Sequence, residues 1–374
     1  MSSLIECTGW NMWSLVWQPF VLSLGGSTYI IGFFNSLWGA IQSILQLGTG
    51  GLADSLGRKK LVNAYYLFSI IGIGLTLIVD SWVYLIPSIL LFAVADSLGE
   101  PAFTPLFAES VDEKRHGTAF SLLSLTWFLP GFYSQLLAGF LGDRVGVRQV
   151  LYITLALEIL SLTVFAAFVK ETLTEKKPVQ LGSLFRGIRE TLKPRGEMAS
   201  FYAMSILDRF GWGLSGGIFV AMIYESFNFT LLQIGALTTA TSVTTALALI
   251  PVGRLVDRYG SKESLMASAA LSAIMFLGFM STDSYVVFLV LQVLKGLAIA
   301  LWDPAHNAYL TNAVEESERG RFFGSLNGLK GILCFPASLI GAYLYDAFGF
   351  SGTFTASLLI SLLTLGFTLR VKEN

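Results

Sequence analysis

The stretch Gly50–Leu61 reads GGLADSLGRKKL, and Gly253–Lys262, 203 positions further on, reads GRLVDRYGSK. Five positions keep their residue type at this offset, which relates Gly50, Leu52, Asp54, Gly57 and Lys59 to Gly253, Leu255, Asp257, Gly260 and Lys262. The same offset places Glu100-Pro101-Ala102 on Asp303-Pro304-Ala305. Because one register covers most of each half, the chain is interpreted as an internal duplication.

Composition places both halves in a membrane. Of the 374 residues, 54% are apolar and only 13% are charged, whereas soluble domains carry about 25% charged residues. A spanning helix needs about 20 mostly apolar residues, and twelve stretches qualify, centred near residues 13, 38, 70, 93, 129, 160, 211, 242, 273, 297, 332 and 361. We therefore predict an all-α polytopic membrane protein with twelve transmembrane helices in two pseudo-symmetric six-helix halves. Such halves, with a substrate site between them, are typical of secondary transporters.

Basic residues predict which side of the membrane each loop faces. Most of the 24 Lys and Arg residues lie near helix ends on one side, whereas Arg144 and Arg148 lie on the other. The positive-inside rule then places both termini in the cytoplasm of a multi-pass protein of the inner (plasma) membrane. The expected organisation is an N-terminal six-helix half at 1–170, a cytoplasmic linker at 171–198 and a C-terminal six-helix half at 199–374.

The linker carries apolar residues at helical spacing, with basic residues elsewhere on the helical wheel. The apolar residues are Leu181, Leu184, Phe185, Ile188 and Leu192. This pattern predicts a helix on an anionic membrane surface, with a partly ordered linker as the alternative. The other loops are too short for a soluble catalytic domain, and Cys7 and Cys334 lack metal-ligand spacing. We predict no catalytic residues, cofactor, metal or nucleic acid, and a monomer in the lipid bilayer.

The duplicated stretch resembles the signature of the major facilitator superfamily, which runs close to G-x-L-A-D-R-x-G-R-R between the second and third spans. The first copy has Ser55 where a basic residue is usual, and the second has Ser261 in place of the first arginine after the glycine. With two copies, twelve spans and a central linker, the resemblance covers essentially the whole chain. It implies the fold of that family, alternating access and a cytoplasmic gate motif. The motif comprises Gly50, Asp54, Gly57, Arg58, Lys59, Glu109, Gly253, Asp257, Arg258 and Gly260.

The motif also has a physical rationale. Glycines permit a tight turn and a close approach of helices, and an aspartate at a helix end can accept hydrogen bonds from the N-terminus of a neighbouring helix. Arg58 and Lys59 can pair with acids on the same rim, and Glu109 and Asp112 are the nearest by topology. Such links would hold the cytoplasmic side shut, and in the family this loop is taken to stabilise the outward-open state. The alternative is that these charges anchor a loop and set topology.

Nine ionisable residues fall within the predicted spans: Glu6, Asp96, Glu100, Glu158, Asp208, Arg209, Lys295, Asp303 and Lys330. A charge at the bilayer centre costs at least ~2.5–3.5 kcal/mol, so such residues indicate function by default. In the superfamily, the first, fourth, seventh and tenth spans line the central cavity, and most of these residues lie there. We expect a structural partner for Glu158, which lies on a peripheral span.

Five of these acids are candidates for proton coupling: Glu6, Asp96, Glu100, Asp208 and Asp303. The repeat pairs Glu6 with Asp208 and Glu100 with Asp303. Asp96 and Glu100 are spaced i, i+4 and share a helix face, and neighbouring carboxylates favour a shared proton that can be released near neutral pH. The alternative is that acids beside the basic residues of the spans are permanently ion-paired.

The candidates for the substrate cavity are Trp10, Trp13, Arg209, Trp212, Lys295, Trp302, His306 and Lys330. Acids and aromatic rings on a cavity wall suit an amphipathic or cationic organic molecule. Lys295 and Lys330 instead favour an anionic group, unless they neutralise the acids. We favour neutralisation slightly, because acids outnumber bases six to three within the spans. Helix packing or an interfacial belt is the alternative for the tryptophans.

The fifth predicted span keeps part of the pattern G-x-x-x-G-P-x-x-G-G, which proton-coupled drug antiporters of the superfamily often carry. Pro130, Gly131 and Gly139 are present, but the glycine before the proline and the paired glycines are missing. The prediction is a secondary active transporter that moves a small organic solute by alternating access, coupled to protons, with drug or metabolite efflux preferred. The alternatives are a proton-coupled uptake permease for an organic anion and, from another class, a polytopic membrane enzyme or a non-transporting sensor.

Overall fold

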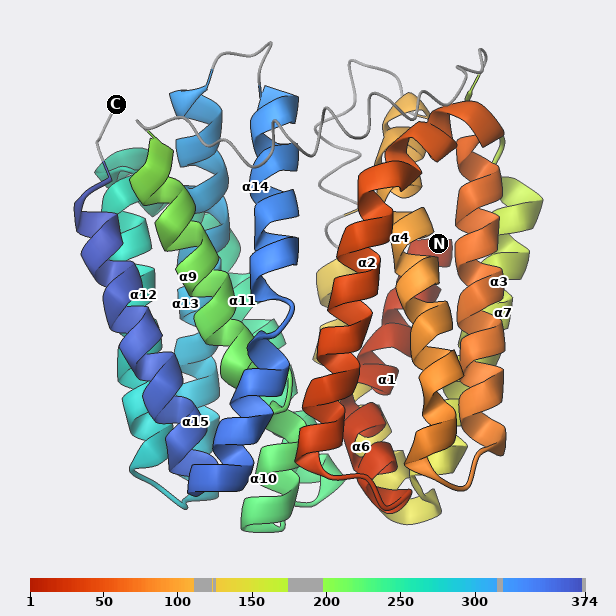
Figure 1. The fold of residues 1–374 in the computed structure, drawn as a ribbon, viewed down its shortest axis with the longest axis horizontal. Coiled ribbons are helices and arrows are strands. Elements are labelled where there is room, and N and C mark those ends of the chain that lie inside the picture. The colour runs from red at the N-terminus through yellow and green to blue at the C-terminus, as the bar shows by residue number, and fades with distance from the viewer. Residues whose placement is uncertain (111–122, 124–125, 174–197, 315–318, 372–374) are drawn as a thin grey trace. The chain divides into compact units, whose positions relative to one another are not determined.

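The computed structural model of the chain describes residues 1–110, 123, 126–173, 198–314 and 319–371 (Figure 1). Its helices, in chain order, are α1 (Ser2–Ser23), α2 (Thr28–Leu56), α3 (Arg58–Ile78), η1 (Trp82–Leu85), α4 (Ile86–Glu109), η3 (Leu129–Phe132), α6 (Ser134–Val145), α7 (Val147–Phe168), α9 (Ala199–Gly216), α10 (Phe219–Phe227), α11 (Leu231–Tyr259), α12 (Ser261–Met280), α13 (Tyr285–Ala313), α14 (Arg319–Cys334) and α15 (Ala337–Leu369). Two predictions lie outside the described residues, namely the linker helix and the role of Asp112. The surroundings of Gly50 and of the Asp54 side chain are not described either.

Eight helices of the described residues are long and apolar enough to cross a membrane. One of them, Leu326–Leu369, runs from the second half of α14 through α15, and Gly349, with a φ of 70°, interrupts α15. α1 and α2 are 22 and 29 residues long, which also suffices for a hydrocarbon core about 30 Å thick at a rise of about 1.5 Å per residue. The fifth predicted span is described continuously only from Thr126 onward.

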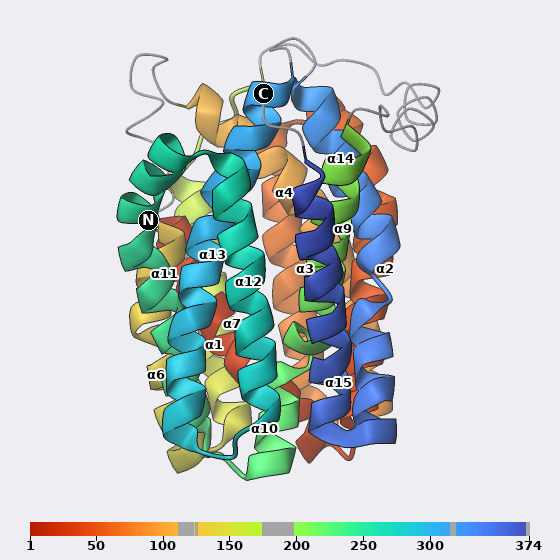
Figure 2. The same cartoon turned by 90° about the vertical axis from the view of Figure 1, so that its left-hand side faces the viewer.

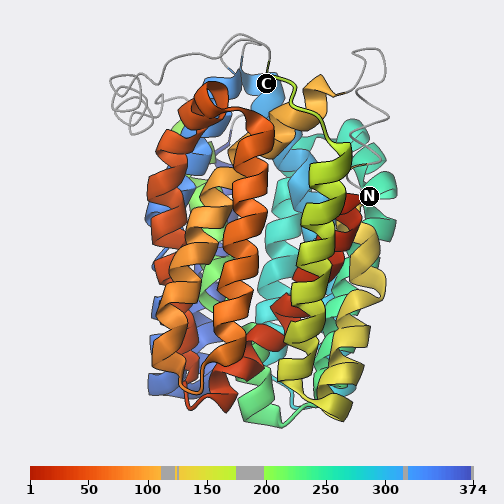
Figure 3. The same ribbon diagram turned by 90° about the vertical axis from the view of Figure 1, so that its right-hand side faces the viewer.

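The chain divides into two compact units. The first unit contains the described residues of Met1–Ser27, Leu37–Arg186 and Thr230–Gly235. Within it α3 packs against α4 and α7, and α1 packs against α6 and α7. Figure 3 shows this unit from the side, with α3 in orange and α7 in yellow-green. Its packing brings the predicted acids of α1, α4 and α7 into one helix bundle.

The second unit contains the described residues of Thr28–Ser36, Gly187–Phe229 and Ala236–Asn374. α15 packs along α9 and α12, and α12 packs along α13. Figure 2 shows α12, α13 and α15 side by side. This unit holds the remaining ionisable residues of the predicted spans, on α9, α13 and α14.

The two units repeat their cores at the offset seen in the sequence. Val62 and Ala102 are buried in one apolar cluster of the first unit. Leu265 and Ala305, 203 positions later, are buried in the corresponding cluster of the second. The duplication therefore extends from the motif to the interior packing beneath it.

Positive-φ glycines follow the same register. Gly57 and Gly146 have φ values of 110° and 98°, and Gly260 and Gly349, again 203 positions later, have values of 95° and 70°. Each lies where one helix ends and the next begins. Because an L side chain is strained at these angles, glycine is the residue these turns require.

Two glycines allow close helix crossings in equivalent places. A Cβ on Gly32 of α2 would lie 2.6 Å from the carbonyl oxygen of Ser338, within the second unit. A Cβ on Gly235 of α11 would lie 2.5 Å from the carbonyl oxygen of Gln135, within the first. The two crossings are equivalent in the repeat, because Gly235 follows Gly32 by 203 positions and Ser338 follows Gln135 by the same number. Small residues of this kind let helix backbones approach in a membrane.

The N-terminus of α11 has acceptors for its first four backbone N–H groups. Thr230 and Gln233 form a capping box, in which the Gln233 N–H donates to Thr230 Oγ1 at 3.2 Å and the Thr230 N–H donates to Gln233 Oε1 at 2.9 Å. Asp143, at the end of α6, accepts from the Leu231 N–H at 2.9 Å and from the Leu232 N–H at 2.8 Å. Its charge also suits the positive end of the helix.

We expect Asp143→Ala to destabilise the protein by about 1 kcal/mol, because two N–H groups of α11 lose their acceptor. Asp346, the exposed residue at the equivalent position of the repeat, provides the matched control, and Asp346→Ala should leave stability unchanged. Thermal unfolding of the purified protein in detergent measures both. An equal loss in the two variants would contradict a specific role for Asp143.

Candidate functional site

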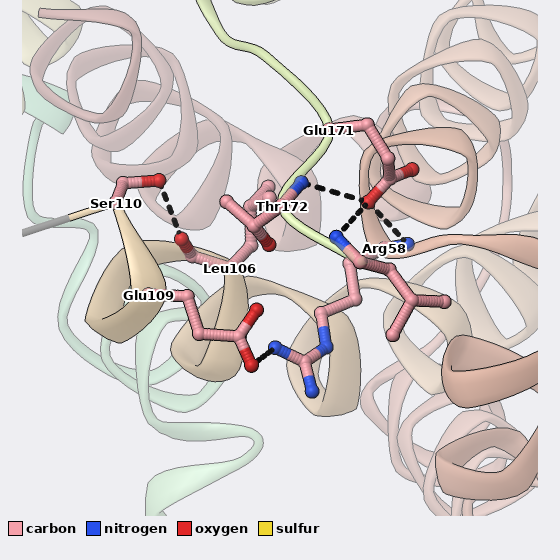
Figure 4. Close-up of polar contacts among 7 residues, drawn as sticks. Arg58, Leu106, Glu109, Ser110, Glu171 and Thr172 are labelled. Carbon is pink, nitrogen blue, oxygen red and sulfur yellow. Dashed lines mark hydrogen bonds and ion pairs between the residues drawn. The ribbon is translucent and has the colours of Figure 1, made fainter. Parts of the chain in front are cut away.

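Arg58, at the start of α3, is held by two acids (Figure 4). Its guanidinium forms an ion pair with Glu109 at the end of α4. Its backbone N–H donates to one carboxylate oxygen of Glu171 at 3.1 Å, and the backbone N–H of Lys59 donates to the other at 3.2 Å. Glu171, which follows α7, thus places negative charge at the positive N-terminus of α3, where it is stabilising.

Gly57 and Lys59 complete this contact. A Cβ on Gly57 would lie 2.5 Å from a Glu171 oxygen, so a larger residue would collide with the carboxylate. The Lys59 ammonium donates to the carbonyl oxygen of Ala166, near the C-terminus of α7, at 2.9 Å, a position that favours positive charge. The first copy of the motif therefore joins the ends of α3, α4 and α7 within the first unit.

The second copy keeps the turn but presents its charges differently. Gly260 retains a positive φ, whereas Asp257 and Arg258 are exposed. The Arg258 guanidinium lies 5.3 Å from the centre of the Tyr259 ring. A Cβ on Gly253 would meet nothing within 4 Å. The sequence similarity of the two copies therefore reflects a shared turn more than shared polar contacts.

In the interior of the first unit, Glu6 of α1 accepts two hydrogen bonds from tyrosines of α3. Tyr65 donates to one carboxylate oxygen at 2.8 Å and Tyr66 to the other at 2.6 Å. Tyr66 is fully buried. Each carboxylate oxygen of Glu6 thus has its own hydroxyl partner, and the contact holds α1 against α3.

Asp96 and Glu100, one turn apart on α4, each receive a donor from α2. The indole N–H of Trp38 donates to Asp96 at 2.8 Å, and the side-chain amide of Gln46 donates to Glu100 at 2.7 Å. Asp96 is partly buried, whereas Glu100 is exposed. The two acids predicted to share a helix face therefore have separate neutral donors.

The tryptophans of α1 divide into packing and accessible residues. Trp13 is only 4% exposed, stacks on Trp17 at 4.9 Å between ring centres and meets Phe92 edge-on at 5.1 Å. Trp10 is 48% exposed and contacts Trp38 edge-on at 6.0 Å. Trp13 thus fits the packing alternative, and Trp10 remains accessible to a ligand.

Glu158, in the middle of α7, lies among other acids. It is buried, and the charges that act on it are those of Glu6 and Asp96. A Cβ on Gly9 would lie 3.4 Å from the Cβ of Leu157, so α1 and α7 pack closely beside these acids. Within the described part of the chain Glu158 makes neither a hydrogen bond nor an ion pair. The structural partner expected for Glu158 is therefore not found among these residues.

In the second unit, His306 of α13 links α9 with α14. Its Nε2 atom lies 3.0 Å from Ser205 Oγ and 3.2 Å from Lys330 Nζ. Its ring stacks on Phe201 at 5.0 Å and on Trp302 at 5.8 Å. When Lys330 is charged its ammonium can only donate, so in that state Nε2 is the acceptor and the imidazole proton is on Nδ1.

Lys330 is also surrounded by the other charges of this unit. It interacts electrostatically with Asp208, Arg209 and Asp303. Asp208 is partly buried, and Arg209 and Asp303 are exposed. Lys330 forms no ion pair with Asp208 or Asp303 among the described residues, so their charges act on it without direct contact, and its neutralising role stays a prediction.

Lys295 has different surroundings. Its Nζ atom lies 5.5 Å from the ring centres of both Trp212 in α9 and Phe219 in α10. The Trp212 side chain also lies near Asp208, one turn earlier on α9. Within the described residues, Lys295 forms no ion pair with a carboxylate, and no acid is among the charges that act on it, whereas Asp208 and Asp303 act on Lys330.

A family model described as Major Facilitator Superfamily matches residues 1–205 and 201–374. The chain belongs to the Major Facilitator Superfamily. It is similar to the multidrug resistance protein MdtG of Dickeya zeae (strain Ech586), with 26% identity covering 87% of this chain and 81% of that protein. It is 23% identical to the MdtG protein of Escherichia coli (strain 55989 / EAEC), over 86% of this chain and 79% of that protein.

Solved structures of the superfamily share the fold. A crystal structure of a mutant of the peptide transporter POT gives a TM-score of 0.79 at 13% identity, covering 99% of this chain and 93% of that one. A crystal structure of the nucleoside transporter NupG gives 0.76 at 16% identity, covering 99% and 96%. The predicted twelve-helix superfamily fold is confirmed, and this member is a multi-pass secondary transporter rather than an enzyme.

The structure gathers the predicted site residues of this superfamily member into three places. Arg58, Lys59 and Glu109 meet at the motif, where the sequence missed Glu171 because it was assigned to the linker. The acids of α1 and α4 lie in the first unit, and the remaining acids lie with the basic residues in the second. Tyr65 and Tyr66 were also missed, since nothing in a single sequence marks a tyrosine as the donor of a particular acid.

We expect Glu171→Gln to destabilise the protein by about 1 kcal/mol, because a neutral amide interacts less well with the N-terminus of α3. Asp283→Asn, at an exposed loop acid, is the control and should have no effect. Thermal unfolding in detergent compares them. If both variants unfold at the wild-type temperature, Glu171 does not stabilise the motif.

Glu158→Gln should leave the unfolding temperature unchanged or raise it, because it removes an acid from beside two others. Glu6→Gln should lower it, since two charge-assisted hydrogen bonds are weakened, at a cost of about 1–3 kcal/mol. The same unfolding assay distinguishes the variants. Equal destabilisation by both would mean that Glu158 has a structural hydrogen bond of its own.

Proposed function

We propose that this chain is a proton-driven exporter of small amphipathic organic molecules and that it works by alternating access. The observation that carries the proposal is the acid group of the first unit, defined as Glu6, Asp96, Glu100 and Glu158. Its donors are hydroxyl, indole and amide groups. Among the described residues, no Lys or Arg side chain forms an ion pair with it.

Electrostatics supports a proton as the partner of this group. Two unit charges about 5 Å apart repel by roughly 3 kcal/mol at an effective dielectric constant of 20. Neutral donors reduce this repulsion only in part, whereas a bound proton removes one of the charges. A group that gains and loses a proton as its surroundings change can couple a proton gradient to a conformational change.

The direction and the substrate class are supported by the relatives and by aromatic surface. Relatives of similar length are named multidrug resistance proteins, which favours export of drug-like molecules. The exposed ring of Trp10 beside Trp38 offers an apolar face for the body of such a molecule. The proposal places both termini in the cytoplasm, following the basic residues, and takes the monomer as the working form.

In the transport cycle, the gate motif connects helix ends of the first unit. Its contacts join the ends of α3, α4 and α7. α4 and α7 carry three acids of the group and α3 carries the tyrosines that bind Glu6, so a change in protonation of the acids can be transmitted to the motif as a change in helix position. We propose that the first copy stabilises one of the access states and that the second copy, with its exposed charges, contributes less to this stabilisation.

The test uses purified protein in liposomes, with a pH dye in the lumen and a substrate chosen by thermal-shift screening. Substitution of Glu6 by Gln, Asp96 by Asn or Glu100 by Gln should, for at least one acid, reduce transport driven by a pH gradient roughly tenfold. Substrate exchange without a gradient should persist in that variant, because binding survives while the proton no longer shifts the equilibrium.

Asp283→Asn serves as the control for loss of an acid outside the spans. The proposal fails if every variant still moves protons with substrate as the wild type does. If protons and substrate move together and the substrate accumulates on the cytoplasmic side, the protein is instead an uptake permease. Failure of the wild type to transport any molecule that stabilises it would identify a sensor.

A further inference from the structure

Lys295 lies in the middle of α13 with its ammonium between two aromatic faces. Nζ is 5.5 Å from the ring centre of Trp212 and 5.5 Å from that of Phe219. Phe219 is buried, whereas Lys295 and Trp212 are only partly buried. The ammonium therefore lies near two aromatic rings, and the residue as a whole is not fully enclosed by the described protein.

The nearest acid along the same helix is too far to neutralise it directly. Asp303 follows Lys295 by eight positions, which is about 12 Å along a helix that rises about 1.5 Å per residue. Asp208 is engaged by the Trp212 side chain and by Lys330. Among the described residues, Lys295 contacts these two rings and no carboxylate.

Lys330 provides the comparison within the same unit. Its Nζ atom lies 3.2 Å from His306 Nε2, and the charges of Asp208 and Asp303 act on it. Attraction to an aromatic face recovers only part of the cost of taking an ammonium out of water. Lys295 therefore has less negative charge near it than Lys330 has.

We propose that Lys295, Trp212 and Phe219 form a subsite for an organic anion, in which the ammonium binds a carboxylate or sulfonate and the rings contact the adjacent apolar body. The proposal rests on the transport function proposed above and specifies its substrate class. Trp212 and Phe219 lie on successive helices, α9 and α10, of the same unit. The subsite lies wholly within the second unit.

Binding to the purified full-length protein in detergent tests this subsite without any gradient. The probes are benzoate, 2-naphthoate and 4-phenylbutyrate, each paired with its neutral amide. At least one acid should bind about tenfold more tightly than its amide, as expected for one charge-assisted hydrogen bond. Lys295→Gln should remove this preference while leaving affinity for the amide unchanged, and Lys295→Arg should retain it.

Lys330→Gln is the matched control, and it should lower stability without removing the preference for the acid. The subsite is refuted if no acid is preferred over its amide, if Lys295→Gln weakens both probes equally, or if the preference disappears only in Lys330→Gln. The wild-type comparison of acid with amide stands even if a variant does not fold. Because binding is measured without protons moving, loss of proton coupling in liposomes would leave this result intact.

Discussion

Every ionisable side chain inside a membrane span has to be compensated, because a charge at the bilayer centre costs at least ~2.5–3.5 kcal/mol. The two units meet this constraint differently. In the second, acids and bases lie near one another, and the charges of Asp208 and Asp303 act on Lys330. In the first, Glu6 and Asp96 receive hydroxyl and indole donors. Neutral donors compensate a carboxylate less completely than a cation does, so the first unit retains a capacity to take up positive charge.

The fold is predictable from the sequence because the duplication reveals the positions at which the backbone accepts only one residue type. Gly57 and Gly260 recur at the same offset since their turns need a positive φ, and the crossing at Gly32 recurs at Gly235 since a side chain there would strike a carbonyl. The backbone does not constrain charged side chains in this way. The contacts of charged residues therefore differ between the two copies, as the exposed Asp257 of the second motif illustrates.

The candidate site is predictable only where topology alone brings residues together. Arg58 and Glu109 lie at helix ends on the same rim, so connectivity was enough to pair them. Partners in the middle of the spans depend on the rotation of each helix about its axis, and a helix that is apolar on most faces leaves this rotation undefined in the sequence. Trp13 therefore turned out to be a packing residue, and Lys295 and Lys330, equivalent by composition, have different neighbours.

Separate locations for the proton and for the substrate charge would constrain how the two are coupled. If the proton binds near Glu6 in the first unit and an anionic group binds Lys295 in the second, the two ligands do not compete for one side chain. Coupling then has to pass through the access equilibrium, which each ligand shifts only by its difference in affinity for the two states. Linkage makes this effect reciprocal, so the factor by which protonation changes anion affinity must equal the factor by which the anion changes proton affinity. A transporter that exchanged its ligands at one shared carboxylate would instead show binding that is mutually exclusive.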